Sequence, residues 1–450
     1  MIPDSPLFLY AFLPAALALF YVAPLRLRCG VLLAESLAYF LLADAPGLPA
    51  LGGATLGNYL FGRCIGGAQG AARRRWLTLG VAANIALLAF YKYAATTAPL
   101  GVSFFTFAAI AYLVDVSRGQ IAADANGLRF ATAMVFFPKI TAGPIARFGP
   151  LLPELAAPRP RLEDFREGGW RLAVGLAKKT LVAGALAPVA DDAFGRAAGL
   201  DMATAWLGLV CYAGQLYYDF SGYTDMAVGI GRMFGARLPE NFDHPYISRS
   251  VREFWRRWHI SLSTWFRDYL YIPLGGSRVA PWRVQANLLI VFSLCGVWHG
   301  ASLNFLVWGL WHGVFLSLER TRLGALLDRA PAAVRHGYLL LAVLLGWVLF
   351  RASDFAVSAA YFKALFSFST TGFDYAWMTV ATRQRLAALA VAVVFAMPLG
   401  GLWASFCRLF GRGEAAVASW GRLAALAGLL AASAMAVAGG GYAPFIYARF

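Results

Sequence analysis

The five histidines of this 450-residue chain are its best candidates for moving a proton near neutral pH, because imidazole has an unperturbed pKa of ~6.5. His299 lies at the junction of two apolar runs, in LLIVFSLCGVWHGASLNFLVWGLWHG. An ionisable side chain at membrane depth is costly unless it faces a cavity or a partner, so His299 is a candidate functional residue. Gly296, Gly300 and Ala301 leave room there for a close backbone approach or a helix break. A hydrogen-bonded structural histidine near a helix end explains the same position equally well.

His259 lies beside Arg256, Arg257 and Trp258, and it faces either a pocket or the lipid headgroups. The surrounding segment, 239–276, reads PENFDHPYISRSVREFWRRWHISLSTWFRDYLYIPLGG and is too polar to cross a membrane. Its apolar and polar residues recur at helical spacing on opposite sides, which predicts an amphipathic helix at the membrane interface. The arginines suit either lipid phosphates or a phosphate-bearing substrate. The apolar side is Phe254, Trp258, Leu262, Trp265 and Tyr269, and the polar side is Arg252, Arg256, Ser263 and Arg267.

Acidic side chains in apolar surroundings are few. Asp219 and Asp225 lie in YYDFSGYTDMAVGIGRMFG with Ser221 between them, and Asp115 follows SFFTFAAIAYLV. A buried acid could serve a proton relay, a substrate contact or a hydrogen bond between helices, and the last role is favoured. A structural role is also favoured for the remaining histidines, which are His244, His312 and His336.

Several common functional motifs are missing from the sequence. It has no G-x-G-x-x-G after a strand pattern and no G-x-x-x-x-G-K-[ST], H-E-x-x-H, G-x-S-x-G or C-x-x-C. Dinucleotide binding and the usual ATPase, zinc-protease, α/β-hydrolase and metal-cluster chemistries are therefore unsupported, and we expect no metal site. The five cysteines are widely spaced and mostly inside apolar runs, so they are predicted to be packing residues. They are Cys29, Cys64, Cys211, Cys295 and Cys407.

The composition requires a bilayer as solvent. Hydrophobic residues make up 60% of the chain and charged residues 14%, against roughly 25% charged in an ordinary globular protein. The mean hydropathy is +0.61. The net charge of +16 comes largely from basic residues between apolar runs, such as 73–75 and 178–179. There they would hold cytoplasmic loops against anionic lipid. We therefore expect no nucleic-acid partner.

The apolar runs predict an all-α polytopic membrane protein. A span needs ~20 apolar residues, which gives roughly ten to twelve transmembrane or re-entrant helices. Some runs are short or contain Gly and Pro, and these we expect to be broken. The first run reads as a retained span rather than a signal peptide, and the N-terminus is expected to face away from the cytoplasm. The runs lie near 7–25, 31–44, 76–94, 100–116, 128–146, 172–190, 203–220, 284–300, 302–318, 337–351, 386–407 and 419–440.

Two functional classes agree with these residues. One is a membrane enzyme that acts on a hydroxyl or acyl group with an imidazole as base. The other is a proton-coupled carrier that uses His299 and the intramembrane acids. The physical pattern alone does not separate them.

At these same residues the sequence resembles the membrane-bound O-acyltransferase family, in particular its bacterial branch that O-acetylates alginate and related exopolysaccharides. The resemblance extends from residue 99 to the C-terminus and is weaker in letters over 320–440. We expect a single membrane domain over 1–450, with N-terminal helices in 1–98, the motif-bearing core in 99–320 and C-terminal helices in 321–450. The matching stretches are PLGVSFFTFAAIAYLVDVSRG at 99–119, FFPKITAGPIARF at 136–148, 217–276, GVWHGASLNFLVWGLWHG at 296–313 and the terminal PFIYARF.

The resemblance implies catalytic roles for His299, in the W-H-G motif, and for His259, in R-W-H-x-S. It also implies a ring of helices around a central tunnel, in which a cytoplasmic donor and an acceptor on the far side meet at the histidine. Cys295 and Leu303 occupy positions where the family pattern leads us to expect Gly and Trp. These two differences affect the expected shape of the pocket and do not affect the expected reaction class. The expected substrate-binding residues are Arg256, Arg257, Trp258, Asp219, Ser221, Asn241, Asp268, Trp298 and Asn304.

The expected reaction moves an acyl group, acetyl in the first instance, from acetyl-CoA or another acyl thioester, with no bound cofactor. The acceptor would be an extracytoplasmic polysaccharide, and the enzyme would lie in the bacterial inner membrane. The resemblance also implies that a periplasmic or surface acetyltransferase partner passes the acyl group to the polymer. Peptidoglycan, cellulose, teichoic acid or a secreted protein are alternative acceptors. The oligomeric state has no signature in the sequence.

Overall fold

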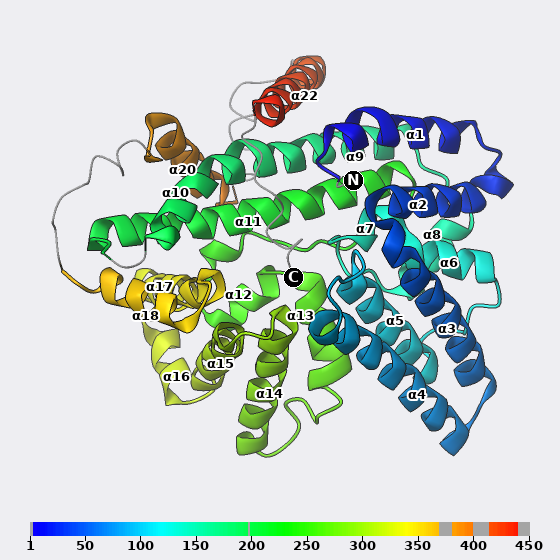
Figure 1. Ribbon diagram of the computed structural model, residues 1–450, viewed down its shortest axis with the longest axis horizontal. Coiled ribbons are helices and arrows are strands. Elements are labelled where there is room, and N and C mark those ends of the chain that lie inside the picture. The colour runs from blue at the N-terminus through cyan, green and yellow to red at the C-terminus, as the bar shows by residue number, and fades with distance from the viewer. Residues whose placement is uncertain (1–2, 197–198, 369–379, 399–413, 440–450) are drawn as a thin grey trace. The chain divides into compact units, whose positions relative to one another are not determined.

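The computed structural model describes residues 3–196, 199–368, 380–398 and 414–439. Every regular element in these ranges is a helix, which confirms the expected all-α class (Figure 1). Four helical stretches in them are long and apolar enough to cross a membrane, namely Leu25–Gly67, Gly70–Ala94, Leu162–Gly195 and Ala332–Arg351. Cys407, the end of the run 386–407 and the terminal PFIYARF lie outside the described residues.

Contacts divide the chain into two compact units. The first unit comprises Met1–Gly175 and Tyr223–Glu240, and the second comprises Leu176–Gly222 and Asn241–Phe450. Two long elements, α9 and α11, continue from one unit into the other. The helices that begin in the first unit are η1 (Phe8–Phe12), α1 (Leu13–Val22), η2 (Leu25–Leu27), α2 (Arg28–Asp44), η3 (Ala45–Gly47), α3 (Leu48–Gly67), α4 (Gly70–Ala89), η4 (Phe90–Ala94), α5 (Val102–Ser117), α6 (Gly127–Val135), α7 (Phe137–Ile140), α8 (Phe148–Ala156) and α9 (Leu162–Ala177).

The run 128–146 in the first unit is one of the broken segments. Helix α6 ends at Val135, Phe136 leaves helical geometry with ψ 108°, and α7 begins at Phe137. Pro138 lies in the first turn of α7, where its missing N–H removes no helical hydrogen bond. The freed N–H of Phe137 donates instead to Ser36 Oγ at 3.1 Å. Backbone that leaves the helix is therefore satisfied by a neighbouring helix, as an apolar surrounding requires.

The second unit holds the residues that the motifs single out. Its helices are η5 (Lys178–Ala183), α10 (Gly184–Gly195), α11 (Met202–Met233, up to residue 222), η6 (Pro245–Ile247), α12 (Val251–Arg257), α13 (Ile260–Phe266), η7 (Arg267–Tyr271), α14 (Pro281–His299), α15 (Leu303–Leu318), α16 (Arg322–Arg329), α17 (Ala332–Arg351), α18 (Phe355–Leu365), α20 (Arg383–Phe395) and α22 (Glu414–Ala438).

The expected amphipathic helix over 239–276 is not continuous. Helix α12 ends at Arg257, Trp258 is extended, and His259 adopts a left-handed conformation with φ 45° before α13 begins. The expected sidedness survives the break, because Phe254, Trp258, Leu262 and Trp265 are buried while Arg252, Arg256 and Arg267 are exposed. A non-glycine residue at positive φ is strained, and such strain occurs preferentially at functional sites. His244 adopts the same conformation with φ 45°, so the backbone geometry by itself assigns no role to His259.

Helices α14 and α15 pack as a tight hairpin, and glycines set their separation. A Cβ at Gly296 would lie 2.2 Å from the carbonyl oxygen of Phe305, and a Cβ at Gly309 would lie 2.2 Å from that of Phe292. Small residues let helix backbones approach closely in membranes, where the lipid supplies no hydrophobic driving force. The glycines therefore hold His299, at the end of α14, against α15.

We predict that Gly309→Ala destabilises the protein by about 1–3 kcal/mol, because the added methyl group overpacks a rigid backbone contact. Thermal unfolding of the purified protein in detergent measures the effect. Gly337→Ala is the matched control, since that glycine lies inside α17 with nothing within 4 Å of the added Cβ. It should be neutral or mildly stabilising. Equal unfolding temperatures for the two variants would contradict the close approach.

Candidate active site

His299 lies inside a cage of aromatic rings. It is the last residue of α14, and 4% of its surface is exposed. The centroid of its ring lies 4.5 Å from that of Trp298, 5.0 Å from Trp308 on α15 and 5.0 Å from Phe350 on α17. Phe305 lies 6.1 Å away, nearly parallel to the imidazole. Three helices therefore position this ring, in surroundings from which bulk water is largely excluded.

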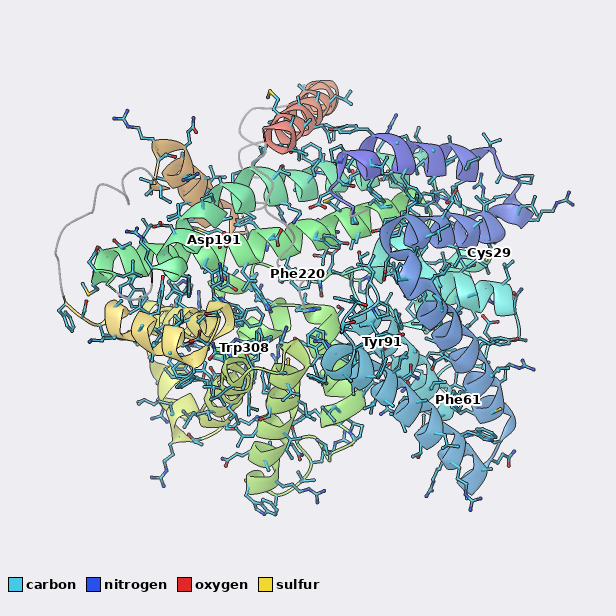
Figure 2. The ribbon with its side chains drawn as sticks, in the orientation of Figure 1. Cys29, Phe61, Tyr91, Asp191, Phe220 and Trp308 are labelled. Atoms are coloured by element: carbon cyan, nitrogen blue, oxygen red, sulfur yellow. The ribbon has the colours of Figure 1, made fainter. Side chains whose placement is uncertain are left out.

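The cage continues as a larger aromatic cluster in the second unit, which consists of Trp255, Trp258, Trp308, Trp347 and Phe350. The rings of Trp308 and Trp347 stack at 18° with centroids 6.2 Å apart, and the Trp347 centroid lies 5.0 Å from that of Trp258. Trp308 is labelled in Figure 2, amid the dense side chains where α15 packs. The cluster leads from His299 to Trp258, the neighbour of His259. A connected set of rings thus joins the two motif histidines.

His259 is held by Asn241 in one tautomer. Its Nδ1 donates to Asn241 Oδ1 at 3.1 Å, and the same oxygen accepts from the N–H and Oγ of Ser261. Burial lowers the pKa of His259 from its ordinary value to about 3, so the ring is neutral at pH 7. Its buried Nε2 has no hydrogen-bond partner among the described residues. With the proton on Nδ1, this Nε2 carries a lone pair that can accept a hydrogen bond.

A cavity of about 430 Å³ lies between α12, α13, α14 and α15. Trp255, Phe292 and Cys295 form part of its apolar wall. Cys295 precedes His299 by one helical turn on α14. Trp255 contacts Trp308, with ring centroids 5.8 Å apart, and Trp308 in turn contacts His299. One wall residue, Trp255, thus contacts the cage of His299, but His299 itself is not among the residues that line the cavity. Four arginines line the same cavity, and they are Arg252, Arg256, Arg267 and Arg320.

These arginines differ in how they are held. Arg267 donates to both oxygens of Asp268, and Arg252 Nη2 donates to the carbonyl of Glu319 at 3.3 Å. The guanidinium groups of Arg256 and Arg320 have no ion pair or hydrogen bond within the described part of the chain. Because guanidinium binds phosphate bidentately, these two arginines form a cationic cavity wall suited to a phosphate-bearing molecule.

The neighbouring Arg257 does not line this cavity. Its Nη1 donates to Asp243 Oδ2 at 2.9 Å, and its Nε donates to Glu253 Oε1 at 3.1 Å. Its charge is therefore used within the protein, and the geometry favours an anchoring role for Arg257. Arg256 and Arg257 are adjacent in sequence but face different surroundings.

The start of α12 is fixed by two acceptors. The carboxylate of Glu319, at the end of α15, accepts from the N–H groups of Val251 at 2.6 Å and Arg252 at 3.0 Å. Ser250 Oγ accepts from the N–H of Glu253 at 3.0 Å. Together these bonds satisfy the free N–H groups of the first turn. They hold α12, and with it Arg256, against α15.

Asp219 is part of a buried ion pair with Lys179, a residue that we expected in a basic loop at the lipid surface. That expectation for Lys179 is wrong. The lysine lies in η5, a π-helical turn inside the continuous helical stretch 162–195, and only 3% of its surface is exposed. A charge inside an apolar stretch requires a partner, and Asp219 on α11 supplies it.

The other expected binding residues are spread over the second unit. Asn304 Nδ2 donates to the carbonyl of Ala352 at 3.0 Å and so ties α15 to the end of α17. Trp298 contacts His299, and Trp258 stacks on Phe254 with centroids 5.4 Å apart. Ser221 is buried on α11, next to Phe220, whose ring lies 4.7 Å from that of His259. Asp268 binds Arg267, as described above.

Sequence reasoning missed several residues of this site. Nothing in the sequence distinguishes the aromatic residues among them from ordinary packing residues. Trp308, Trp347 and Phe350 lie within apolar runs, and Trp255 lies in the polar segment 239–276. Arg320 follows α15 directly, and its position at a helix end was the only available signal. Among the described residues, no group of three or more His, Cys, Asp and Glu side chains could hold a metal ion.

Comparison with known proteins identifies the family. Residues 124–359 match the model of the MBOAT, membrane-bound O-acyltransferase family. The chain is 38% identical over 423 residues to the probable alginate O-acetylase AlgI of Azotobacter vinelandii, covering 88% of this chain and 84% of that protein. It is 39% identical over 397 residues to the protein of the same name in Pseudomonas aeruginosa, covering 82% and 76%. It is 34% identical over 406 residues to the peptidoglycan O-acetyltransferase of Helicobacter pylori, covering 78% and 77%.

These relatives carry the names of acyl-transferring enzymes, which supports the enzyme class over the carrier class. The apolar helices and the family agree on a protein that crosses the membrane several times. The chain therefore belongs to the membrane-bound O-acyltransferase family, and it is a membrane enzyme of the O-acetyltransferase class.

Proposed function

We propose that this enzyme transfers acetyl from acetyl-CoA, on the cytoplasmic side, toward hydroxyl groups of an extracytoplasmic polysaccharide. The names of its relatives support the acetyl group and the polymer, since they are an alginate O-acetylase and a peptidoglycan O-acetyltransferase. The proposed location is the inner membrane of a bacterium, because the donor is made in the cytoplasm while the polymer lies outside the membrane.

The arginine-lined cavity is the observation that carries the donor assignment. A CoA thioester combines several phosphates with a small acyl group at the end of a long arm. The cavity offers free guanidinium groups on Arg256 and Arg320 at one part of its wall and apolar side chains near Cys295 at another. Phosphates on the arginines would thus direct the thioester toward His299.

In the proposed reaction, His299 takes the proton of the accepting hydroxyl as that oxygen attacks the thioester carbonyl. The new C–O bond forms, the C–S bond breaks, and the proton passes from the imidazolium to the departing thiolate of CoA. The alternative order forms a transient acyl group on His299 itself, followed by attack of the acceptor. In both orders the aromatic cage keeps water from hydrolysing the thioester.

His259 is proposed to position a substrate rather than to move a proton. Its pKa of about 3 makes His259 a poor base near neutral pH. Its unbonded Nε2 can instead accept a hydrogen bond from an N–H or O–H group of either substrate, the acyl donor or the polysaccharide. Asn241 fixes the tautomer that leaves this lone pair without a proton. A central tunnel that joins both sides at the histidines is part of the same proposal.

A partner completes the proposed pathway. The acceptor polymer is bulky and extracytoplasmic, so a periplasmic or surface acetyltransferase would collect the acetyl group and modify the polymer. Acetylation of alginate and of peptidoglycan, each measured with and without added periplasmic extract, tests the acceptor and the need for a partner. Cellulose, teichoic acid and secreted proteins are the other acceptors to compare. Release of CoA without any acetylated acceptor would contradict the proposed transfer.

We predict that Arg256→Ala raises KM for acetyl-CoA by about 10- to 100-fold, because one charge-assisted phosphate contact contributes roughly 1.5–3 kcal/mol. The release of CoA by the purified enzyme, measured with acceptor polymer and periplasmic extract present, gives KM and kcat. Arg257→Ala is the matched control: it should leave KM nearly unchanged and lower the unfolding temperature, since its partners are Asp243 and Glu253. A larger effect on KM from Arg257 than from Arg256 would reverse the two roles.

A further inference from the structure

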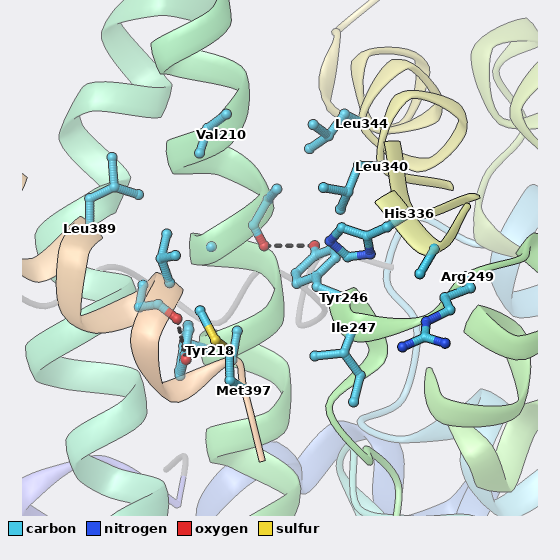
Figure 3. A pocket seen from close by; sticks show the side chains of 16 residues that line it. Val210, Tyr218, Tyr246, Ile247, Arg249, His336, Leu340, Leu344, Leu389 and Met397 are labelled. Atoms are coloured by element: carbon cyan, nitrogen blue, oxygen red, sulfur yellow. Dashed lines mark hydrogen bonds between the residues drawn. The ribbon is translucent and has the colours of Figure 1, made fainter. Parts of the chain in front are cut away.

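A second cavity, of about 510 Å³, lies in the second unit between α11, α17, α20 and the segment Tyr246–Arg249 (Figure 3). It shares no lining residue with the arginine-lined donor cavity. Aliphatic side chains dominate its wall, among them Val210, Leu340, Leu344 and Leu389. A cavity of this size and lining is large enough for a ligand and offers little to bind water.

The hydroxyl groups in this cavity are already used by the protein. Tyr218 donates to the carbonyl of Ala392 at 2.7 Å, and Tyr246 donates to the carbonyl of Ala213 at 2.9 Å. These bonds tie α11 to α20 and to the Tyr246 segment. Because both tyrosine hydroxyls are already hydrogen-bonded, neither offers a free polar group to the inside of the cavity. The inside of the cavity therefore suits an aliphatic ligand.

One side of the cavity is polar, and it carries Arg249 and His336 (Figure 3). The guanidinium group of Arg249 is exposed and has no hydrogen bond or ion pair in the described ranges. His336 Nδ1 donates to the carbonyl of Ser248 at 3.0 Å, which fixes the ring at this side. A free guanidinium group at one side of an apolar cavity suits a phosphate group.

The order of residues along α17 agrees with a lipid. His336, Leu340 and Leu344 follow each other at intervals of four residues, so they lie on one face of α17. The histidine lies near the beginning of a helix that is long enough to cross a membrane, and the leucines lie about one and two turns further along it. Headgroup phosphates lie at the ends of such helices and acyl chains lie along them.

We propose that this cavity binds one glycerophospholipid, with an acyl chain between α11, α17 and α20 and its phosphate on Arg249. The lipid lies behind the aromatic cluster, because Trp347 Nε1 donates to the hydroxyl of Tyr246 in the cavity wall at 3.2 Å. Bound lipid would therefore support Trp347, which contacts Trp308 and Phe350 of the cage around His299, without contacting the reacting groups.

The test is to purify the full-length protein in mild detergent, extract it and identify phospholipid by mass spectrometry. Thermal unfolding is then followed with added phosphatidylglycerol. The wild-type protein should retain phospholipid and unfold at a higher temperature when lipid is added. Leu340→Trp fills the cavity and should abolish both effects. Arg249→Gln removes the phosphate contact on the surface and should weaken lipid binding about tenfold or more.

Two variants outside the cavity are the controls. Leu341→Trp changes the next residue of α17, whose side chain is 50% exposed, and Arg329→Gln removes an exposed arginine of α16. Both should retain the lipid. The proposal is overturned if wild-type protein carries no phospholipid and gains no thermal stability from it, or if Leu340→Trp binds it normally. It is equally overturned if inorganic phosphate or a free fatty acid stabilises the protein as well as phosphatidylglycerol does.

Discussion

Replacing His299 by Ala is expected to lower the rate of acyl transfer by about 10²–10⁴-fold, which is the usual contribution of a positioned acid–base group. The physical reason is that the aromatic cage holds this imidazole in a fixed position and excludes water that could replace it. The release of CoA from acetyl-CoA by the purified enzyme, with acceptor polymer and periplasmic extract present, measures the rate. If His299 carries the acyl group covalently, the loss should be complete.

A second variant separates catalysis from packing. His299→Ala leaves a cavity among Trp308, Phe350 and Phe305, so it could lower stability as well as activity. His299→Gln keeps more of the volume but cannot act as a base, and it should be equally inactive while unfolding near the wild-type temperature. His244→Asn is the control, because His244 lies in a loop at positive φ, which Asn tolerates. A well-folded His299→Gln enzyme with near wild-type activity would remove His299 from the mechanism.

Replacing Lys179 by Met is expected to destabilise the protein by about 3–5 kcal/mol, because it leaves the Asp219 carboxylate buried without its cation. Only 4% of the surface of Asp219 is exposed, so water cannot replace the lysine. Unfolding in detergent, by heat or denaturant, measures the loss. The double variant Lys179→Met/Asp219→Leu removes both charges and should recover most of the stability.

Activity of the double variant decides what the pair does. If it is stable and active, the ion pair only joins η5 to α11, and Asp219 is not a substrate contact. If it is stable but inactive, the pair serves proton movement or substrate binding, as an intramembrane charge often does. Wild-type stability in the single Lys179→Met variant would contradict the buried pair itself. Arg196→Met, which breaks a half-exposed pair with Asp192, is the comparison and should cost ~1 kcal/mol or less.

Much of the fold was predictable from local sequence, because a bilayer imposes a simple rule on each segment. An apolar run of sufficient length must satisfy its backbone internally, and a helix does so without help from elsewhere. The apolar runs within the described ranges therefore coincide with helices, and the helix is broken in the run 128–146. Helix α3 was missed because glycines interrupt its apolar residues. The family was predictable as well, because the motif stretches that carry it are short and continuous in the chain.

The site itself depended on contacts between distant residues, which no local pattern contains. The helix break at Trp258 and His259 is stabilised by Asn241, 18 residues before His259. Lys179 is buried because its partner lies 40 residues further along the chain. Whether an arginine can bind a substrate depends on the acidic side chains that the fold brings next to it. Arg257 is paired with Asp243, whereas Arg256 lines the donor cavity.

The sequence by itself thus determined that the protein lies in a membrane, that its fold is helical, which family it belongs to and which two histidines lie in the family motifs. These follow from composition, from hydropathy over single segments and from short stretches of letters. Only the tertiary structure decided which rings enclose His299, which arginines face the donor cavity and which charges neutralise each other. Each of those depends on the free energy of packing side chains that are far apart in the chain, so the residues reveal it only once they are folded together.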